Sequence, residues 1–431
     1  MSILRSMQIG VAGLRAHSEA LGVAGDNIAN VNTVGFKAQR GTFQDQLGRS
    51  IAGAGSDPTP GAGSRLAHIE QMWTQGALLT TDSPTDLALS GDGFFIVDGT
   101  VGGTTGRYFS RAGQFHIDAD GQLVNPGGLR LQGYTAQPDG TMGSTLGNLT
   151  VTPGTIPANP TTEIQAAVNL DSNAQQPAPF DPTDPAGTSN FSNTVTVYDS
   201  LGNGHEITVY YAKNGPNSWE WHAMVDGGDL AGGTPGAPVE GASGTLTFTT
   251  DGRLDTESAG ASSWDFIDAA PGQVITFDFG SSVTGDLGDG LDGSTQFASP
   301  STTTGLSQDG FAAGSVAGIS IGPDGRITGI FNNGQQRAIG QVAVASFGSV
   351  EGLARGGQGL WHATEESGQA LVGAAETGGR GSVVAGALEQ SNVDLGAEFV
   401  NLISYQRGFQ ANSRVITTAD EMYGELVNLK R

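Results

Sequence analysis

The sequence predicts a mixed, multidomain fold. Long N- and C-terminal α-helices pair in a coiled-coil-like way, and two mainly-β domains lie between them in the chain, the second inserted into the first. Amphipathic helical periodicity is confined to the two ends of the 431-residue chain, and strand-like segments fill the region between them. Glycine accounts for 69 residues, about twice its usual share, as expected for many tight turns. A chain of this length exceeds what one core usually serves, which favours two or three domains.

The N-terminal segment has the period of one amphipathic helix. Its apolar residues follow alternating steps of three and four, with Ser18 and Gly25 at the two remaining seam positions. The predicted seam consists of Leu4, Met7, Val11, Leu14, Leu21 and Ile28. Four glycines in this stretch lower its intrinsic helix propensity, so we expect contacts with neighbours to order it.

The C-terminal segment repeats this pattern over a longer stretch. Ser391 and Asp394 precede it and resemble a capping box, because they supply a side-chain acceptor and an acid at the helix N-terminus. The predicted seam consists of Leu395, Phe399, Leu402, Phe409, Ile416, Tyr423 and Val427. An apolar stripe must be buried, so we expect the two stripes to pair and to find partners on other copies of the chain. A two-helix clip that closes an ordinary monomer is the alternative.

Between the two ends the apolar period changes to two. Segments rich in β-branched and aromatic residues predict strands at 93–97, 194–198, 207–211, 245–248, 274–277 and 341–344. Asp-Gly pairs begin at Asp120, Asp139, Asp251 and Asp324. The glycine of such a pair supplies the positive φ that hairpin turns require. The middle of the chain is therefore predicted to be mainly β.

Loops rich in proline, glycine and asparagine set the predicted domain boundaries. They occur at 153–160, 173–187 and 298–306. The prediction assigns 1–30 and 388–431 to a terminal helical, tube-forming domain, 31–73 and 381–387 to a connecting segment, 74–150 and 302–380 to a first β domain, and 151–301 to an inserted outer β domain.

Charge and cysteine content narrow the possible partners. The net charge is −24, and residues 1–50 carry +2 while residues 391–431 carry −1, so the acidity belongs to the middle. Such a middle repels nucleic acid and anionic membrane surfaces, and no apolar run is long enough to predict membrane insertion. Charged and polar residues interrupt the N-terminus, which predicts no cleavable secretory signal. The absence of cysteine excludes disulfides, thiolate metal sites and a cysteine nucleophile.

The search for catalytic or ligand-binding motifs is negative. Residues 288–293 fit a dinucleotide fingerprint, but Asp289 and Asp292 would face the pyrophosphate and no helix follows. Asp286 with these two, and Asp118 with Asp120, resemble parts of a calcium loop that lacks its twelfth-position ligand. The six histidines show no zinc-binding spacing. We therefore predict no catalytic, cofactor or metal site, and we expect Trp219, Trp221 and Trp264 to be core residues rather than a sugar platform.

The segment 27–37, NIANVNTVGFK, resembles the N-terminal signature of the axial proteins of the bacterial flagellum, the rod and hook family. Its signature residues are Asn27, Asn30, Asn32, Gly35 and Phe36. The asparagines favour the end of a helix and turns, and Gly35 allows the backbone to reverse. Residues 86–95 and 108–125 are similar to the first β domain of that family, and 405–413 resembles its C-terminal segment. Residues 197–211 resemble the extra outer domain of its hook members.

The resemblance implies a structural subunit of the flagellar hook that assembles into a flexible tubular universal joint linking rod to filament. It implies a helical homopolymer outside the cell, with flagellar rod proteins, the hook cap, hook–filament junction proteins and the flagellar type III export apparatus as partners, and no cofactor. A distal rod protein of the basal body is the alternative within the family. A secreted β-rich adhesin or glycan-active enzyme is the alternative outside it.

Overall fold

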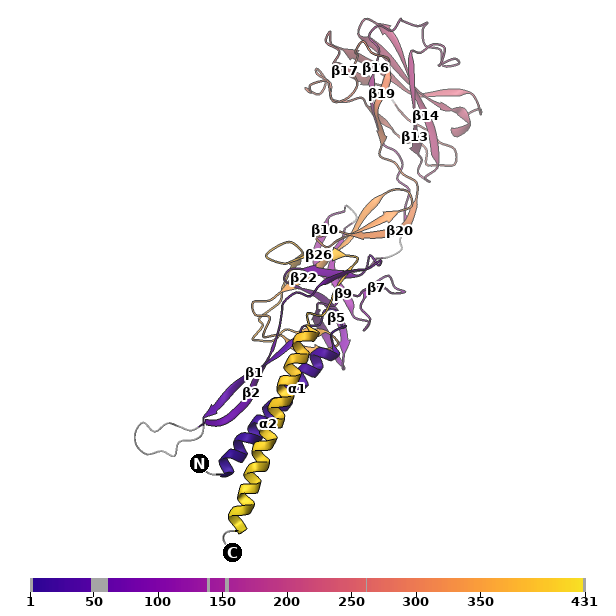
Figure 1. Ribbon diagram of the computed structural model, residues 1–431. Helices are drawn as coiled ribbons and strands as arrows, with labels where there is room; N and C mark the ends of the chain where they lie inside the picture. Colours follow the sequence, from indigo (N-terminus) through magenta and orange to yellow (C-terminus); the bar gives the residue numbers. More distant parts are fainter. Residues whose placement is uncertain (1–2, 48–60, 138–139, 152–154, 261, 429–431) are drawn as a thin grey trace. The chain divides into compact units, whose positions relative to one another are not determined.

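The computed structural model describes residues 3–47, 61–137, 140–151, 155–260 and 262–428 (Figure 1). The chain divides into two compact units. Unit 1 comprises Met1–Pro153, Gly318–Ile330 and Gln336–Arg431, and unit 2 comprises Gly154–Ala317 and Phe331–Gln335. In the described part of the chain, no helix has the length and apolar character needed to cross a bilayer.

Two long helices lie side by side in unit 1: α1 (Ile3–Ala29) and α2 (Leu395–Asn428) (Figure 1). They run antiparallel and approach closely at glycines. A Cβ on Gly13 would lie 2.5 Å from Oδ1 of Asn412, and one on Gly10 would lie 2.9 Å from Cγ1 of Ile416. These two glycines lower helix propensity, but the structure shows that the close approach of the helices also requires them.

A long hairpin follows α1, and the sequence did not predict it. Strands β1 (Gln39–Leu47) and β2 (Gly61–Gln71) pair antiparallel within the segment expected only to connect helix and β domain. Their polar sequences have no alternating apolar pattern, so the strand signal was weak. Phe43 of β1 lies 5.7 Å from the His17 ring of α1 and 6.0 Å from the Tyr405 ring of α2. The hairpin is therefore fastened to both helices.

The β part of unit 1 is built around strand β5 (Phe94–Val101), whose first four residues are all buried. Phe95 and Val97 belong to the core on one face, and Phe94 and Ile96 to the core on the other. The remaining strands are β3 (Leu78–Thr80), β4 (Leu87–Ser90), β6 (Thr104–Ser110), β7 (His116–Ile117), β8 (Leu123–Val124), β9 (Arg130–Ala136), β10 (Met142–Asn148), β21 (Arg326–Phe331), β22 (Gln336–Ser346), β23 (Ala354–Gly357), β24 (Leu360–His362), β25 (Leu371–Ala374), β26 (Ser382–Ala385) and β27 (Ala387–Glu389). Strand β22 pairs with β5, β9 and β25, so distant parts of the chain share one sheet.

Unit 2 contains a five-stranded antiparallel sheet in the order β13-β14-β15-β16-β17 and a three-stranded sheet in the order β18-β12-β19. Its elements are β11 (Thr155–Ile156), β12 (Glu163–Asn169), β13 (Phe191–Tyr198), β14 (Gly204–Gly215), β15 (Ser218–Asp226), the short 3-10 helix η1 (Gly227–Asp229), β16 (Pro238–Phe248), β17 (Leu254–Ala259), β18 (Thr276–Asp278) and β19 (Thr302–Gln308), while β20 (Gly314–Ile321) continues into unit 1. Trp219, Trp221 and Trp264 are at most 1% exposed, so they are core residues as expected.

The predicted strands and turns are largely confirmed. All six predicted segments contain strand, although at 274–277 the strand β18 begins only at Thr276, and Val274 is 58% exposed. The glycines that follow Asp120, Asp251 and Asp324 have φ between 76° and 84°. Gly140 has φ 80°, while its partner Asp139 lies outside the described residues. The hairpins β7–β8, β9–β10 and β16–β17 each turn at one of these glycines.

A candidate assembly surface and its buried anchor

The face of α1 that packs within the chain is made of small residues. Gly10, Gly13, Ala16, Ala20 and Ala24 are buried, and they recur at steps of three and four. Side chains this small let a second helix and the hairpin approach closely. This inward face is not the predicted seam, which lies beside it on the same helix.

The predicted seam of α1 stays largely accessible. Leu4 is 61% exposed and Val11 is 55% exposed. Met7, Leu14, Leu21 and Ile28 are partly buried. Of the two small residues that complete the seam, Ser18 is exposed, and Gly25 has no neighbour within 4 Å of where a Cβ would stand. A monomer therefore leaves an apolar stripe of α1 only partly covered.

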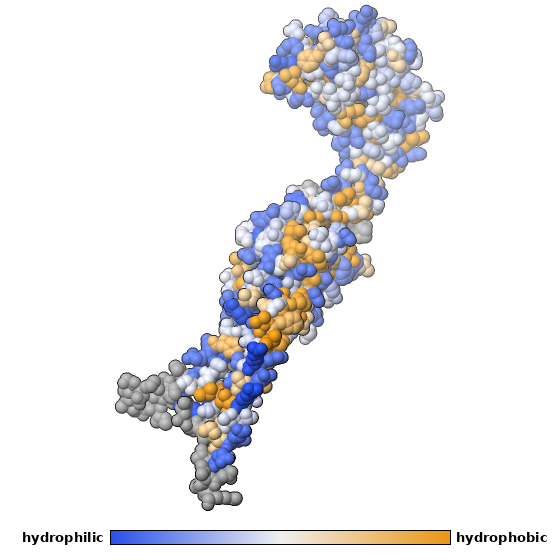
Figure 2. All heavy atoms as spheres, in the orientation of Figure 1, coloured by the Kyte–Doolittle hydropathy of each residue, from blue (hydrophilic) through white to orange (hydrophobic). Residues whose placement is uncertain are grey.

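The predicted seam of α2 is divided between two roles. Leu402 and Ile416 are partly buried, and Ile416 contacts Gly10 of α1. Leu395, Phe399, Phe409 and Tyr423 are between 39% and 51% exposed. Val427 lies in α2, but its side chain is outside the described residues. Figure 2 shows apolar residues alternating with hydrophilic ones along this helical pair. We name the exposed apolar residues of the two predicted seams the outward stripes: Leu4, Val11, Leu395, Phe399, Phe409 and Tyr423.

Asn27 joins α1, the hairpin and α2 through one buried side chain. Its Oδ1 accepts a hydrogen bond from the Gln39 N–H at 2.8 Å, and its Nδ2 donates to the Gln39 carbonyl at 2.7 Å. The same Nδ2 donates to Oε1 of Glu398 at 3.0 Å. Asn27 is 0% exposed, and its two partners are partly buried, so loss of this side chain would leave partly buried polar groups without their partner.

Asn27→Ala should destabilise unit 1 by about 1–3 kcal/mol, because it leaves partly buried polar groups of Gln39 and Glu398 unpaired. Asn32→Ala is the matched control: Asn32 belongs to the same signature but is exposed, and its change should stay within about 0.5 kcal/mol. Urea unfolding followed by tryptophan fluorescence measures both. Equal effects of the two substitutions would contradict the anchoring role of Asn27.

The other signature residues shape the turn after α1. Nδ2 of Asn30 donates to the Asp26 carbonyl and carboxylate, and Thr33 donates to Oδ1 of Asn30. Gly35 has φ 69°, and a Cβ there would lie 2.5 Å from the Ala112 nitrogen, so both conformation and space require glycine. Phe36 is buried with the Arg355 guanidinium 5.7 Å from its ring centroid.

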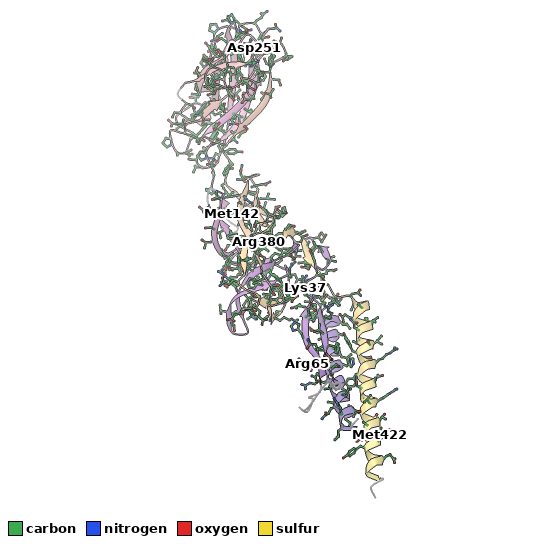
Figure 3. The ribbon with its side chains drawn as sticks, turned by 90° about the vertical axis from the view of Figure 1, so that its left-hand side faces the viewer. Lys37, Arg65, Met142, Asp251, Arg380 and Met422 are labelled. Atoms are coloured by element: carbon green, nitrogen blue, oxygen red, sulfur yellow. The ribbon has the colours of Figure 1, made fainter. Side chains whose placement is uncertain are left out.

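A buried ion cluster lies directly beyond the signature. Nζ of Lys37 is 2.6 Å from Oε1 of Glu389, and a guanidinium nitrogen of Arg111 is 3.4 Å from Oε2 of the same carboxylate. Lys37 is 1% exposed, Arg111 5% and Glu389 0%. Figure 3 shows Lys37 where the hairpin meets the β part of unit 1. One carboxylate thus faces two cations, and the three residues come from three distant parts of the chain.

Backbone groups complete this cluster, which we name the anchor (Lys37, Arg111, Glu389). Lys37 also donates to the Thr74 carbonyl at 2.9 Å, Arg111 donates to the Gly91 carbonyl at 2.8 Å, and the Gly76 N–H donates to Glu389 at 2.9 Å. Burial lowers the pKa of Lys37 and of Arg111 below their ordinary values, and the facing Glu389 carboxylate counteracts both shifts.

Asn392 fastens the start of α2 to the same region. Its Oδ1 accepts from the Ala38 N–H at 2.7 Å, and its Nδ2 donates to the carbonyls of Met72 and Thr74. Asp394 then caps α2 by accepting from the backbone N–H groups of Gly396 and Ala397. Sequence reasoning placed Asn392 within a capping motif and missed its link to the connecting segment, because that link spans more than 300 residues.

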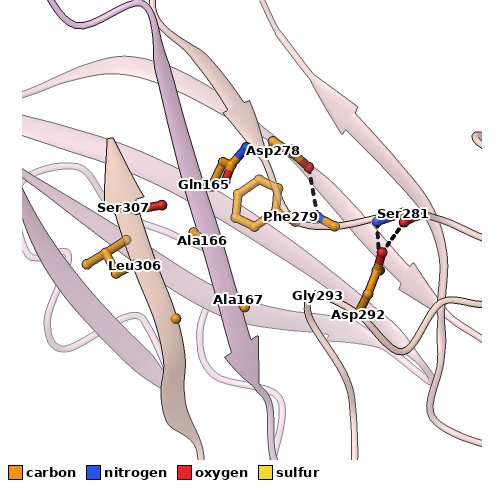
Figure 4. Close-up of a pocket in the computed structure, with 12 residues that line it drawn as sticks. Gln165, Ala166, Ala167, Asp278, Phe279, Ser281, Asp292, Gly293, Leu306 and Ser307 are labelled. Carbon is orange, nitrogen blue, oxygen red and sulfur yellow. Dashed lines mark hydrogen bonds between the residues drawn. The ribbon is translucent and has the colours of Figure 1, made fainter. Parts of the chain in front are cut away.

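Aspartate side chains in the turns of unit 2 accept hydrogen bonds from nearby backbone N–H groups. A hollow of about 310 Å³ lies beside strands β12 and β19, where the chain turns away after β18 (Figure 4). Asp278 accepts from the Gly280 N–H, and Asp292 accepts from both N and Oγ of Ser281. Asp289 accepts from the Leu291 N–H in the same way. Within the described residues, no group of His, Asp or Glu side chains is arranged to hold a metal ion.

Four family models match the chain in succession. They are Flagella basal body rod protein at 7–37, Flagellar hook protein FlgE/F/G D1 domain at 88–176, Flagellar basal body protein FlaE D2 domain at 169–311, and Flagellar basal body rod FlgEFG protein C-terminal at 384–429. The first contains the signature, and the last contains all of α2. The matched segments therefore include most of α1, all of α2 and parts of both β-rich units.

Curated relatives match nearly end to end. The chain is 36% identical to the flagellar hook protein FlgE of Borreliella burgdorferi, over 99% of this chain and 100% of the relative. It is 35% identical to that of Salmonella typhimurium, over 97% of this chain and 98% of the relative, and 34% identical to that of Treponema pallidum, over 100% of each. The crystal structure of Helicobacter pylori flagellar hook protein FlgE2 shares the fold, with a TM-score of 0.52 at 15% identity, over 72% of this chain and 100% of that one.

Proposed function

The chain belongs to the flagellar hook protein family, and from this premise we propose how its two ends and its β-rich units serve hook assembly. It is a structural subunit of the bacterial flagellar hook. The proposed mechanism is self-assembly into a tube in which the outward stripes of α1 and α2 are buried against other copies. The observation that carries it is the row of large apolar side chains, from Leu395 to Tyr423, left exposed on α2.

The proposed assembly residues are the predicted seams of the two helices. Leu4, Met7, Val11, Leu14, Leu21 and Ile28 of α1 act with Leu395, Phe399, Leu402, Phe409, Ile416, Tyr423 and Val427 of α2. Burying one large apolar side chain is worth about 1.5–3 kcal/mol, so a few such contacts per subunit hold a tube together. The coiled-coil-like pairing of α1 with α2 presents both stripes to neighbouring subunits.

The four-part domain organisation belongs to the same proposal. Residues 1–30 and 388–431 form the tube, and 31–73 with 381–387 connect it to the first β domain at 74–150 and 302–380. Residues 151–301 form the inserted outer domain. The anchor supports this division of labour, because its two cations and one carboxylate tie the connecting segment to the β domain without using the outward stripes.

The proposed partners follow from the place of a hook between rod and filament. They are copies of the chain itself, flagellar rod proteins, the hook cap, hook–filament junction proteins and the flagellar type III export apparatus. We further propose that the chain is not an enzyme. Three carboxylates in and near the hollow of unit 2 support this, because Asp278, Asp292 and Asp289 accept hydrogen bonds from the backbone N–H groups of Gly280, Ser281 and Leu291.

Truncation tests the proposed assembly. Deleting residues 1–26 and 399–431 removes most of both stripes and spares Asn27, Glu389, Asn392 and Glu398. We expect the truncated chain to keep the sheet signal in circular dichroism and to form no tubes in electron microscopy, whereas the full chain polymerises. A truncated chain that still polymerises, or a full-length chain that stays monomeric at high concentration, would contradict the proposal.

A further inference from the structure

A groove lies between α1 and the β1–β2 hairpin, both within unit 1. It has a volume of about 390 Å³. Apolar groups come from Val11, Ala12 and Leu66, and charged groups from Arg15, Glu19 and Arg65. Val11 is 55% exposed, and the Arg15 side chain is 84% exposed although it pairs with Glu19 at 3.4 Å. This α1–hairpin groove therefore offers an accessible apolar surface beside two arginines and one glutamate.

The free end of α2 has the complementary character. We name residues 420–425 the α2 tail: Met422 is 54% exposed and Tyr423 51%, and the acids Asp420, Glu421 and Glu425 are all exposed. Helix α2 has 34 residues against 27 in α1, and it runs on past the N-terminal end of α1 (Figure 1). Figure 3 shows Met422 near that end and Arg65 on the hairpin.

The charges of the α2 tail are unfavourable where they stand. A helix C-terminus carries a partial negative charge, which acidic side chains in the last turns oppose. Between Val415 and Asn428 there are three acids and no basic residue, while Lys430 and Arg431 lie outside the described residues. A cationic surface from outside the helix would relieve this repulsion. The α1–hairpin groove supplies one, with two arginines against one glutamate.

The tail cannot reach the groove of its own chain. Ile416 contacts Gly10, and Asn412 contacts Gly13, so α2 runs away from Arg15 toward its own C-terminus. Tyr423 lies seven residues beyond Ile416, or roughly 10 Å further along the helix axis in that direction. A second copy of the chain has no such restriction, and a helical polymer places many copies side by side.

We propose that the α2 tail of one copy docks in the α1–hairpin groove of a second copy. Met422 and Tyr423 contact Val11, Ala12 and Leu66, and the tail carboxylates pair with Arg15 and Arg65. The inference rests on the proposed polymerisation and adds to it a defined contact between subunits. It makes the hairpin part of the assembly surface rather than a passive connection.

Charge exchange tests the contact. Arg15→Glu with Arg65→Glu, and separately Glu421→Arg with Glu425→Arg, should each raise the critical concentration for polymerisation by about tenfold. The chain with all four substitutions should assemble to within about threefold of the unmodified chain. Arg107→Glu, an exposed site on β6, controls for charge alone and should change assembly by less than about twofold. A fourfold variant as defective as either double variant overturns the inference.

Cross-linking gives a second readout that does not depend on variant stability. The chain has no cysteine, so single cysteines react uniquely. Polymers grown from mixed Ala12→Cys and Met422→Cys chains should yield disulfide-linked dimers on oxidation. Mixtures of Ala12→Cys with Leu201→Cys, an exposed site in unit 2, should yield less than about a tenth as much. Equal yields from both mixtures overturn the inference, because the groove would then show no preference for the α2 tail.

The two proposals fail in different ways. An unmodified chain that never polymerises refutes the proposed function and the docking contact together. An unmodified chain that polymerises, with neither rescue by charge exchange nor a selective cross-link, refutes the docking contact alone.

Discussion

Glu389→Gln should destabilise unit 1 by about 3–5 kcal/mol. The substitution removes the only carboxylate that contacts both buried cations of the anchor among the described residues, and it keeps the side-chain size. Lys37 and Arg111 then remain buried without their counter-charge, and breaking a buried ion pair in this way costs far more than the intact pair contributes. Hydrogen–deuterium exchange of peptides covering β3 and β27 measures the loss locally, because these strands pair at Glu389.

The exposed pair between Arg40 and Glu70 provides the matched control. Its nitrogen and oxygen are 2.9 Å apart, and the Arg40 side chain is 59% exposed. Glu70→Gln should therefore cost no more than about 1 kcal/mol. An equal loss of stability in Glu389→Gln and Glu70→Gln would show that the contribution of the anchor to stability does not depend on its burial.

The loss of stability caused by Glu389→Gln should become smaller as the pH rises. Burial already lowers the pKa of Lys37, and removing the carboxylate removes the main influence that raises it. Because the folded state then binds fewer protons than the unfolded state, stability increases with pH in the range where Lys37 deprotonates. Exchange rates at pH 7 and pH 10, each compared with Glu70→Gln at the same pH, check this sign. A loss that stays constant over that range would contradict it.

The ends and the turns of the fold could be predicted from local sequence. Seams with steps of three and four indicated α1 and α2, and Asp-Gly pairs indicated hairpins whose glycines have positive φ at Gly121, Gly252 and Gly325. These features depend on residues near one another in the chain, so their signal is complete within a short window. The strand segments were found for the same reason.

The inward face of α1 and the hairpin could not be predicted in this way. Helix packing through Gly10, Gly13 and Ala16 uses residues too small to stand out in an apolar pattern, yet they decide which face α2 contacts. Strands β1 and β2 are polar and pair with each other through backbone hydrogen bonds. Their strand conformation therefore depends on this pairing rather than on their amino-acid composition.

The anchor could not be predicted, because its three residues are far apart in the sequence. Lys37 and Glu389 are 352 positions apart, and Arg111 is 278 positions from Glu389. The signature and the first β-domain motif contained both cations, but nothing local connected either to the carboxylate. One weak signal was present: Glu389 follows two apolar residues in a buried strand, where a lone charge requires a partner.

Phe399→Asp should abolish polymerisation while the monomer stays folded. Phe399 is 51% exposed on α2, so the charge costs little in the free chain. In the proposed tube the same side chain is buried, and losing that burial alone is worth about 1.5–3 kcal/mol per contact, which raises the critical concentration by about 10- to 150-fold. Phe409→Asp should act in the same way, because Phe409 is 39% exposed. Sedimentation and electron microscopy measure assembly, and circular dichroism measures the fold.

Two controls separate assembly from folding. Leu201→Asp places the same charge on a 60% exposed leucine of unit 2 and should change assembly by less than about twofold. Leu402→Asp changes a partly buried residue of the helical pair, so it should weaken both the monomer and the polymer. If Phe399→Asp instead lost sheet signal as a monomer, Phe399 would be part of the monomer's own core. That result would contradict the assignment of the outward stripes as an interface, because the substitution would impair folding of the monomer rather than contacts between copies.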